Sequence, residues 1–354
     1  MAFKYINPGY AELLSVSGGT TVMGEQYSKT GVSFWQPNNR KGLSLSETPT
    51  EFYAKFDLYI QGVTGSDDVD FSFDIGYQNG IYLSGYRGLT FSGYAGTSSV
   101  FYISEIRDIV PMEALSTVWL HIKEGKDHNG ILHVVVNNHE ICNKRDLNIS
   151  YSDASDSKTI KIHSDNLRAL ISNLIISDEE ISPREQVVML PIQATHTNMT
   201  DCGDGSYEAT AANQEILQTV DVTALSAQYG ADSRVTGISL VGNPAYRTAE
   251  GLCALTALEK SGGNVTEYGR HIAEQNRCCH GRTNYIYDDC RTHWATVRME
   301  SRNMSIKLKP VVCISWLPMG RIHLKPIVYV TVIPVFRQSV QVRGDTSRNV
   351  TSSC

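Results

Sequence analysis

Apolar and polar residues alternate one by one along two stretches of the chain, and this pattern restricts what it can fold into. In residues 51–60 the apolar positions are Phe52, Ala54, Phe56, Leu58 and Ile60. In residues 69–75 they are Val69, Phe71, Phe73 and Ile75. Successive side chains of a strand point to opposite faces, so a period of two indicates strands with one buried face. Turn residues recur about every eight to twelve positions between residues 51 and 176, which predicts an all-β fold with an antiparallel sandwich or barrel.

A hairpin is predicted between residues 118 and 136. Val118, Leu120 and Ile122 share one strand face, a polar turn follows over residues 126–130, and a second apolar run spans residues 131–136. The turn ends in Asn-Gly, and both of these residues tolerate the positive φ that tight hairpin turns require. A last strong strand is predicted over residues 170–176.

Three of these segments together resemble the concanavalin A-like and laminin-G-like jelly-roll family. They are the strand that contains Trp119, the strand that ends at Asn137-Asn138, and the late Ile171-Ser-Asn-Leu strand. Where the family usually has Asp-Gly, this chain has Asn137-Asn138, which leaves the turn type open. The resemblance covers about residues 30–180 and implies an antiparallel jelly-roll β-sandwich, placed here at residues 31–183, with a lectin-like recognition surface.

An N-terminal arm (residues 1–30) precedes the sandwich, and a smaller β-rich module (residues 184–268) follows it. The module is predicted to contain a short helix at residues 223–229. Three segments resemble uncharacterised prophage-encoded virion proteins of gut bacteria. They are Tyr5-Ile-Asn-Pro-Gly-Tyr near the start, the segment from Leu217, and Gly242-Asn-Pro-Ala-Tyr. This resemblance covers most of residues 1–268 and implies a structural or tail-associated protein of a bacteriophage.

The last quarter of the chain differs in composition from the rest. Residues 264–354 contain 13 Lys and Arg against 6 Asp and Glu, whereas the whole chain has a formal charge of −6. Five of the eight cysteines also lie there. We therefore separate residues 269–354 as a basic, Cys-rich tail. One hypothesis is a frameshift that leaves residues 270–354 out of frame and poorly ordered, and the other is a genuine basic β-domain.

A carboxylate series follows the polar face of the second alternating run. It consists of Asp68, Asp70 and Asp74. We expect no cofactor, with calcium at these residues as the alternative, because clustered carboxylates suit calcium. Hydrolysis of a glycan is the second alternative, because alternate strand residues lie about 6.6 to 6.8 Å apart. The hydrolytic pattern of the family, Glu-x-Asp-x-(x)-Glu, is absent, so we predict no catalytic residue and no enzymatic activity. The third alternative is a solvated strand face.

Aromatic residues are dense in the next segment, with nine in the 32 residues from Phe71 to Tyr102. Tyrosine offers a flat apolar ring together with a hydroxyl group, which suits contact with a sugar or a protein. The candidate contact residues are Tyr77, Tyr82, Tyr86 and Tyr94. The competing interpretation is cross-strand packing.

These observations predict a non-enzymatic phage or prophage structural protein that binds a glycan or a host-surface protein. Its other expected partners are further virion proteins and copies of itself. The negative charge argues against nucleic acid, and the apolar stretch 326–336 is too short to span a bilayer. The start of the sequence has no signal-peptide pattern, so we expect cytoplasmic synthesis and a location in the virion. The alternatives are a glycan-active hydrolase or lyase on the same scaffold, and a bacterial surface adhesin.

Overall fold

The computed structural model describes residues 4–9, 20–35, 41–43, 49–63, 69–76, 79–85, 89–104, 106, 109–151, 160–190, 192–201 and 203, and beyond these the backbone of strands between residues 207 and 333. Every described element is a strand, and all pairings between them are antiparallel. The prediction of an all-β fold is therefore confirmed. The helix expected at residues 223–229 lies outside the described residues. The described part of the chain holds no helix of the length and apolarity that a membrane span needs.

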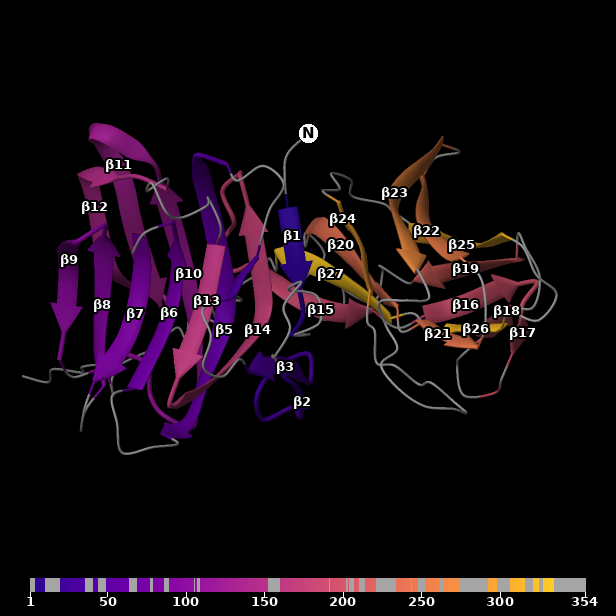
Figure 1. Cartoon of the computed structure of the whole chain (residues 1–354), viewed down its shortest axis with the longest axis horizontal. Helices are drawn as coiled ribbons and strands as arrows, with labels where there is room; N and C mark the ends of the chain where they lie inside the picture. The colour runs from indigo at the N-terminus through magenta and orange to yellow at the C-terminus, as the bar shows by residue number, and fades with distance from the viewer. Residues whose placement is uncertain are drawn as a thin grey trace, which may run out of the picture.

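Two sheets form the sandwich, and they lie one behind the other on the left of Figure 1. The eight-stranded sheet has the order β12 (His139–Ile149), β11 (Gly125–Val136), β10 (Leu115–Lys123), β5 (Glu51–Val63), β14 (Leu167–Ser177), β3 (Val32–Trp35) and β2 (Thr20–Met23), with β1 (Lys4–Asn7) also paired to β14. The six-stranded sheet has the order β4 (Lys41–Leu43), β13 (Ile160–Asp165), β6 (Val69–Ile75), β7 (Asn79–Gly85), β8 (Thr90–Ala95) and β9 (Ser98–Ile103).

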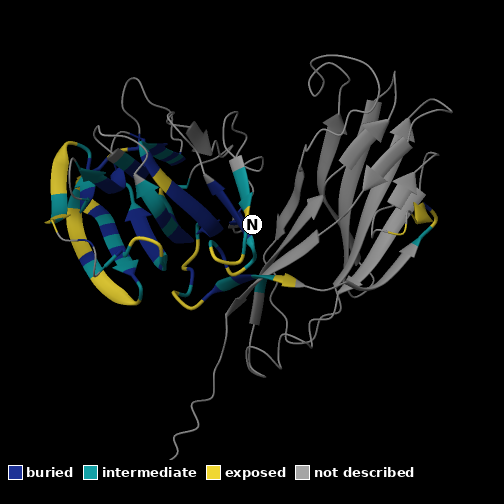
Figure 2. Cartoon of the chain, turned by 90° about the horizontal axis from the view of Figure 1, so that it is seen from below, coloured by how far each residue is buried: buried dark blue, intermediate teal, exposed yellow. Residues whose placement is uncertain are grey.

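The alternating residues supply the core between these two sheets. All five apolar residues predicted for β5, from Phe52 to Ile60, are at most 1% exposed, as are Phe71, Phe73 and Ile75 of β6. The rings of Phe56 and Phe73 stack across the sandwich with centroids 5.0 Å apart. Figure 2 shows that the buried residues are concentrated in the strands of the sandwich. Burial of one face of each strand thus holds the sandwich together.

The predicted hairpin is formed by β10 and β11, which pair from Val118 with Val136 to Lys123 with Ile131. The polar turn that we expected at residues 126–130 is irregular instead, because Gly125 and Gly130 also pair with β12 across register shifts. Asn137 and Asn138 have φ angles of 51° and 65°. Two consecutive positive φ values characterise the tight hairpin turn of type I′, so this turn between β11 and β12 keeps the conformation that Asp-Gly would adopt.

Strands from β15 onward form three further sheets, on the right of Figure 1. The first has the order β15 (Gln186–Leu190), β27 (Ile327–Ile333), β20 (Arg234–Gly242) and β24 (Thr292–Val297). The second has the order β16 (Ile192–Thr197), β19 (Gln214–Val220), β25 (Ile306–Ser315), β22 (Leu252–Ser261) and β23 (Asn264–Ala273). The third has the order β17 (Thr200–Asp201), β18 (Tyr207–Ala209), β26 (Arg321–Leu324) and β21 (Pro244–Arg247). The predicted domain boundaries and the frameshift hypothesis stay predictions.

Candidate functional site

The outer face of the eight-stranded sheet is covered in its centre by the chain that leads into β15. The indole N–H of Trp119 donates a hydrogen bond to the carbonyl of Ile181 over 2.8 Å, and the ammonium of Lys55 donates to the carbonyl of Glu185. Trp119 is 5% exposed and Lys55 is 6% exposed. Burial lowers the pKa of Lys55 to about 8. This part of the molecule therefore serves internal packing.

The outer face of the six-stranded sheet has a different construction. Strand pairing places five outward residues directly side by side in a row that crosses five strands: His163 (β13), Ser72 (β6), Tyr82 (β7), Ser92 (β8) and Tyr102 (β9). Neighbouring strands lie about 4.8 Å apart, so the row spans roughly 19 Å. We call these five residues the transverse row. Residues with rings alternate along the row with serines, whose side chains are much shorter.

Two side chains in the transverse row have buried polar atoms without a partner. The Ser72 hydroxyl and Nδ1 of His163 make no hydrogen bond within the described part of the chain. Ser72 is 0% exposed, and the His163 side chain is 12% exposed. Most buried polar side chains in folded proteins are hydrogen-bonded, so each exception calls for an explanation. The two residues are directly opposite in register, so their unsatisfied atoms lie on the same part of this face.

The predicted carboxylates Asp70 and Asp74 lie on this same face, and Asp68 falls outside the described residues. Asp70 Oδ2 is 3.9 Å from Nε2 of His163, and Asp74 is paired in register with Lys161. Four residues of strand separate the two aspartates by about 13 Å. Among the described residues no three His, Cys, Asp or Glu side chains form a group that could hold a metal ion. Calcium binding stays a prediction.

Two of the four predicted tyrosines come together on this face. The rings of Tyr82 and Tyr94 pack edge to face with centroids 5.3 Å apart. Tyr77 and Tyr86 lie outside the described residues. Tyr82 is 8% exposed, so its ring is mostly packed while it borders the serine positions of the row. Contact with a glycan stays a prediction for these residues.

Sequence reasoning missed His163, Ser72 and Tyr102. A signal for His163 was present, because Ile160 and Ile162 point inward on β13 and are at most 3% exposed. The same period of two sends Lys161 and His163 to the outer face. No feature of the sequence around β13 indicated that this strand pairs with β6.

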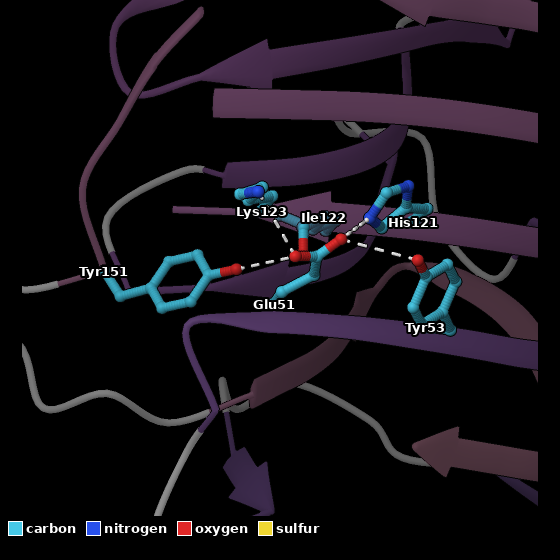
Figure 3. Close-up of polar contacts among 6 residues, drawn as sticks. All are labelled: Glu51, Tyr53, His121, Ile122, Lys123 and Tyr151. Carbon is cyan, nitrogen blue, oxygen red and sulfur yellow. Dashed lines mark hydrogen bonds and ion pairs between the residues drawn. The ribbon is translucent and has the colours of Figure 1, made fainter. Parts of the chain in front are cut away.

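A second polar network lies on the outer face of the eight-stranded sheet (Figure 3). Oε1 of Glu51 is 2.8 Å from Nε2 of His121, and Oε2 of Glu51 is 3.3 Å from Nζ of Lys123. The hydroxyl of Tyr53 donates to Glu51 over 3.4 Å, and its ring stacks on that of His121 with centroids 4.2 Å apart. Nearby on the core side of the same sheet, the buried Tyr151 donates to the carbonyl of Ile122 over 3.1 Å. Both carboxylate oxygens of Glu51 have partners within the protein, so these contacts stabilise the fold.

This network predicts that the fold weakens in mild acid. Burial lowers the pKa of His121, and the hydrogen bond to Glu51 offsets only part of that effect. Burial works to raise the pKa of Glu51, but hydrogen bonds from His121 and Lys123 outweigh it and lower this pKa below its usual value. As the pH falls through the ordinary histidine pKa of 6.5, the unfolded chain takes up a proton before the folded chain does, and stability decreases. Glu51 adds a second loss below its ordinary pKa of 4.5.

The measurement is urea unfolding at neutral pH and at about pH 5, where histidines become charged. His121→Gln should lose less stability over this range than the wild type. The exposed His139→Gln variant is the matched control and should follow the wild type. Equal losses in His121→Gln and the wild type would contradict this account.

Comparison with known proteins gives matches to solved structures. No protein-family model and no curated protein sequence matches the chain. An endo-β-1,4-glucuronan lyase from the fungus Trichoderma reesei is 10% identical with a TM-score of 0.34, covering 49% of this chain and 95% of its own. The alginate lyase vAL-1 from Chlorella virus is 12% identical with a TM-score of 0.27, covering 42% and 77%. A carbohydrate esterase from the Shiga toxin-encoding bacteriophage phi24B is 7% identical with a TM-score of 0.32, covering 51% and 100%.

These matches correct the prediction that the chain is not an enzyme. That prediction rested on the absence of one hydrolase pattern, Glu-x-Asp-x-(x)-Glu. The similar structures include lyases and an esterase, so the absence of a hydrolase pattern does not exclude activity. The predicted phage virion location, host-surface target and oligomeric state stay predictions.

Proposed function

We propose that this chain binds an acidic glycan on the outer face of the six-stranded sheet and cleaves it by β-elimination. The observation that carries the proposal is the first part of the transverse row. His163 and Tyr82 lie on the two strands that flank Ser72. Their backbones are about 10 Å apart, because two strand spacings separate them. Nδ1 of His163 and the Ser72 hydroxyl are buried and make no hydrogen bond within the described part of the chain.

The proposed chemistry needs one base and one acid. In a uronic acid the C5–H lies next to the carboxyl carbon, and a positioned base can remove it. Nδ1 of His163 takes this proton. Electrons of the C5–H bond form the C4–C5 double bond, the bond between C4 and the glycosidic oxygen breaks, and Tyr82 donates its proton to the leaving oxygen. Asp70, 3.9 Å from Nε2 of His163, stabilises the imidazolium that results.

The negative charge of the substrate also needs a partner. Lys161 lies two residues from His163 on the same face of β13, and its ammonium donates to the carbonyl of Gly76 over 3.4 Å. The ammonium of Lys161 stabilises the negative charge that develops on the uronate carboxyl group as C5 loses its proton. Substrates without a carboxyl group next to the scissile bond are therefore expected not to react.

Hydrolysis is the second candidate, favoured by one pairing. Asp165 is directly opposite Asp70 on the neighbouring strand, which brings their Cβ atoms to about 5 Å. Retaining glycosidases place two carboxyl groups roughly 5 to 5.5 Å apart. Asp70 and Asp74 are too far apart for this role. The two mechanisms give different products, so one assay separates them.

The test is incubation of the full chain with uronate polymers (glucuronan, alginate and pectin) and with neutral polysaccharides. β-Elimination yields an ultraviolet-absorbing unsaturated uronate together with one new reducing end. We expect both signals with at least one uronate polymer. New reducing ends without ultraviolet absorbance would replace the lyase by the hydrolase, and no cleavage of any polymer would overturn the proposal.

A further inference from the structure

A buried polar cluster lies on the outer face of the eight-stranded sheet, under the chain that leads into β15. Lys55, Asp57, Asn173 and Glu185 line one cavity, which has room for about one water molecule. Each of these four residues is at most 7% exposed. Lysine and carboxylate side chains are rarely buried to this degree, because their desolvation is costly. Their concentration around one cavity therefore calls for an explanation.

Strand pairing brings the amine of Lys55 and the carboxamide of Asn173 to this cavity. Lys55 of β5 is paired with Ile175 of β14, and Asn173 lies two residues before Ile175, within a register shift. Diagonal neighbours of this kind are about 7 to 8 Å apart, within reach of a long side chain. Asn173 has a φ of 54°, a left-handed conformation that asparagine tolerates. The bulge places its side chain beside Asp57 and the cavity.

The carboxamide of Asn173 is held at both of its polar atoms. Its Nδ2 donates a hydrogen bond to Oδ2 of Asp57 over 2.7 Å, and its Oδ1 accepts one from the hydroxyl of Thr30 over 3.2 Å. The hydroxyl of Thr117 donates to Oδ1 of Asp57 over 2.7 Å and so orients this carboxylate. Substitution at an amide carbon requires a proton for the departing nitrogen and a donor for the oxygen that becomes negative. Asp57 and Thr30 occupy these two positions.

The amine of Lys55 has the properties of a nucleophile. Burial lowers its pKa to about 8, so a larger share of it is neutral near pH 7 than in an exposed lysine. Its Nζ donates to the backbone carbonyl of Glu185. A neutral amine keeps this hydrogen bond while its lone pair is directed across the cavity at the carboxamide carbon of Asn173.

We infer that Lys55 and Asn173 form an intramolecular isopeptide bond that joins β5 to β14. Nζ of Lys55 forms a bond to Cγ of Asn173, and the electrons of the carbonyl move to Oδ1. The carbonyl then forms again, the Cγ–Nδ2 bond breaks, and Nδ2 leaves with its electron pair. Asp57 takes one proton from Nζ and gives one to Nδ2, which departs as ammonia. The reaction needs no further reactant, and it closes residues 55–173 into a covalent loop.

The test is the mass of the full chain, measured after denaturation and reduction. We expect a mass that is lower than that of the sequence by one ammonia molecule. A protease digest should contain the peptide with Lys55 joined to the peptide with Asn173. Lys55→Met and Asn173→Ala should each restore the full mass. A wild-type chain at full mass, or a loss of ammonia that maps to other residues, would overturn the inference.

Matched variants separate this reaction from a nonspecific loss of ammonia. Lys144→Met and Asn143→Ala are the controls, because both residues are exposed on β12 of the same sheet, and both variants should keep the cross-link. Asp57→Asn removes the proton carrier and should leave most of the chain at full mass. Complete cross-linking in Asp57→Asn would overturn the chemistry assigned to Asp57. Circular dichroism checks the fold of each variant, while the wild-type mass tests the bond without any variant.

Discussion

Replacing His163 by Gln is expected to lower the rate of glycan cleavage by about 10²- to 10⁴-fold, the usual contribution of a general base. Glutamine keeps a polar side chain of similar length but cannot accept the C5 proton. His163 is suited to the role because Nδ1 is buried without a partner while Nε2 is 3.9 Å from Asp70 Oδ2. The measurement is the initial rate of unsaturated uronate formation with the polymer that the wild type cleaves.

Two controls separate catalysis from folding and binding in this prediction. The exposed His139→Gln variant carries the same chemical change on β12 and should cleave at the wild-type rate. The KM of His163→Gln for the same polymer should stay within a few-fold of the wild-type value, because Ser72 and Tyr82 remain. A variant that cleaves at the wild-type rate would remove His163 from the mechanism.

Replacing Phe56 by Ala is expected to lower the free energy of unfolding by about 3 to 5 kcal/mol. Phe56 is 0% exposed on β5, and its ring stacks on Phe73 of the opposite sheet with centroids 5.0 Å apart. The substitution removes buried apolar surface and leaves a cavity at the centre of the sandwich. Domains are typically stable by only 5 to 15 kcal/mol, so the loss is a large share of the total.

Urea unfolding monitored by circular dichroism measures this effect. Phe56→Leu, which retains most of the apolar volume, should lose clearly less stability than Phe56→Ala. Met112→Ala is a surface control, because Met112 is 45% exposed, and it should change stability by less than about 0.5 kcal/mol. A loss for Phe56→Ala no larger than this control would mean that the Phe56–Phe73 contact does not hold the two sheets together.

The candidate site was only partly predictable. Alternation in β6 correctly separated Phe71 and Phe73 on the core side from Asp70 and Asp74 on the outer side. In the tyrosine-rich segment, Tyr82 and Tyr94 pack against each other, and their contact with a glycan stays a prediction. The prediction of no enzymatic activity was wrong to rest on the absence of one hydrolase pattern along one strand. A site assembled from several strands leaves no such linear pattern.

The amino-acid sequence by itself determined which side of each strand is buried. A period of two is a local property, so Phe52 to Ile60 could be assigned to the core without knowing any neighbouring strand. The turn at Asn137-Asn138 was local in the same sense, because its conformation depends on two residues that tolerate positive φ.

Only the tertiary structure decided which strands are neighbours. The pairing of β13 with β6 brings His163 opposite Ser72, and the pairings of β7, β8 and β9 extend the row to Tyr102. Many strand orders would bury the same apolar faces nearly as well, so burial alone does not select one. The chosen order depends on how all the strands pack together at once, and it is this order that creates the transverse row.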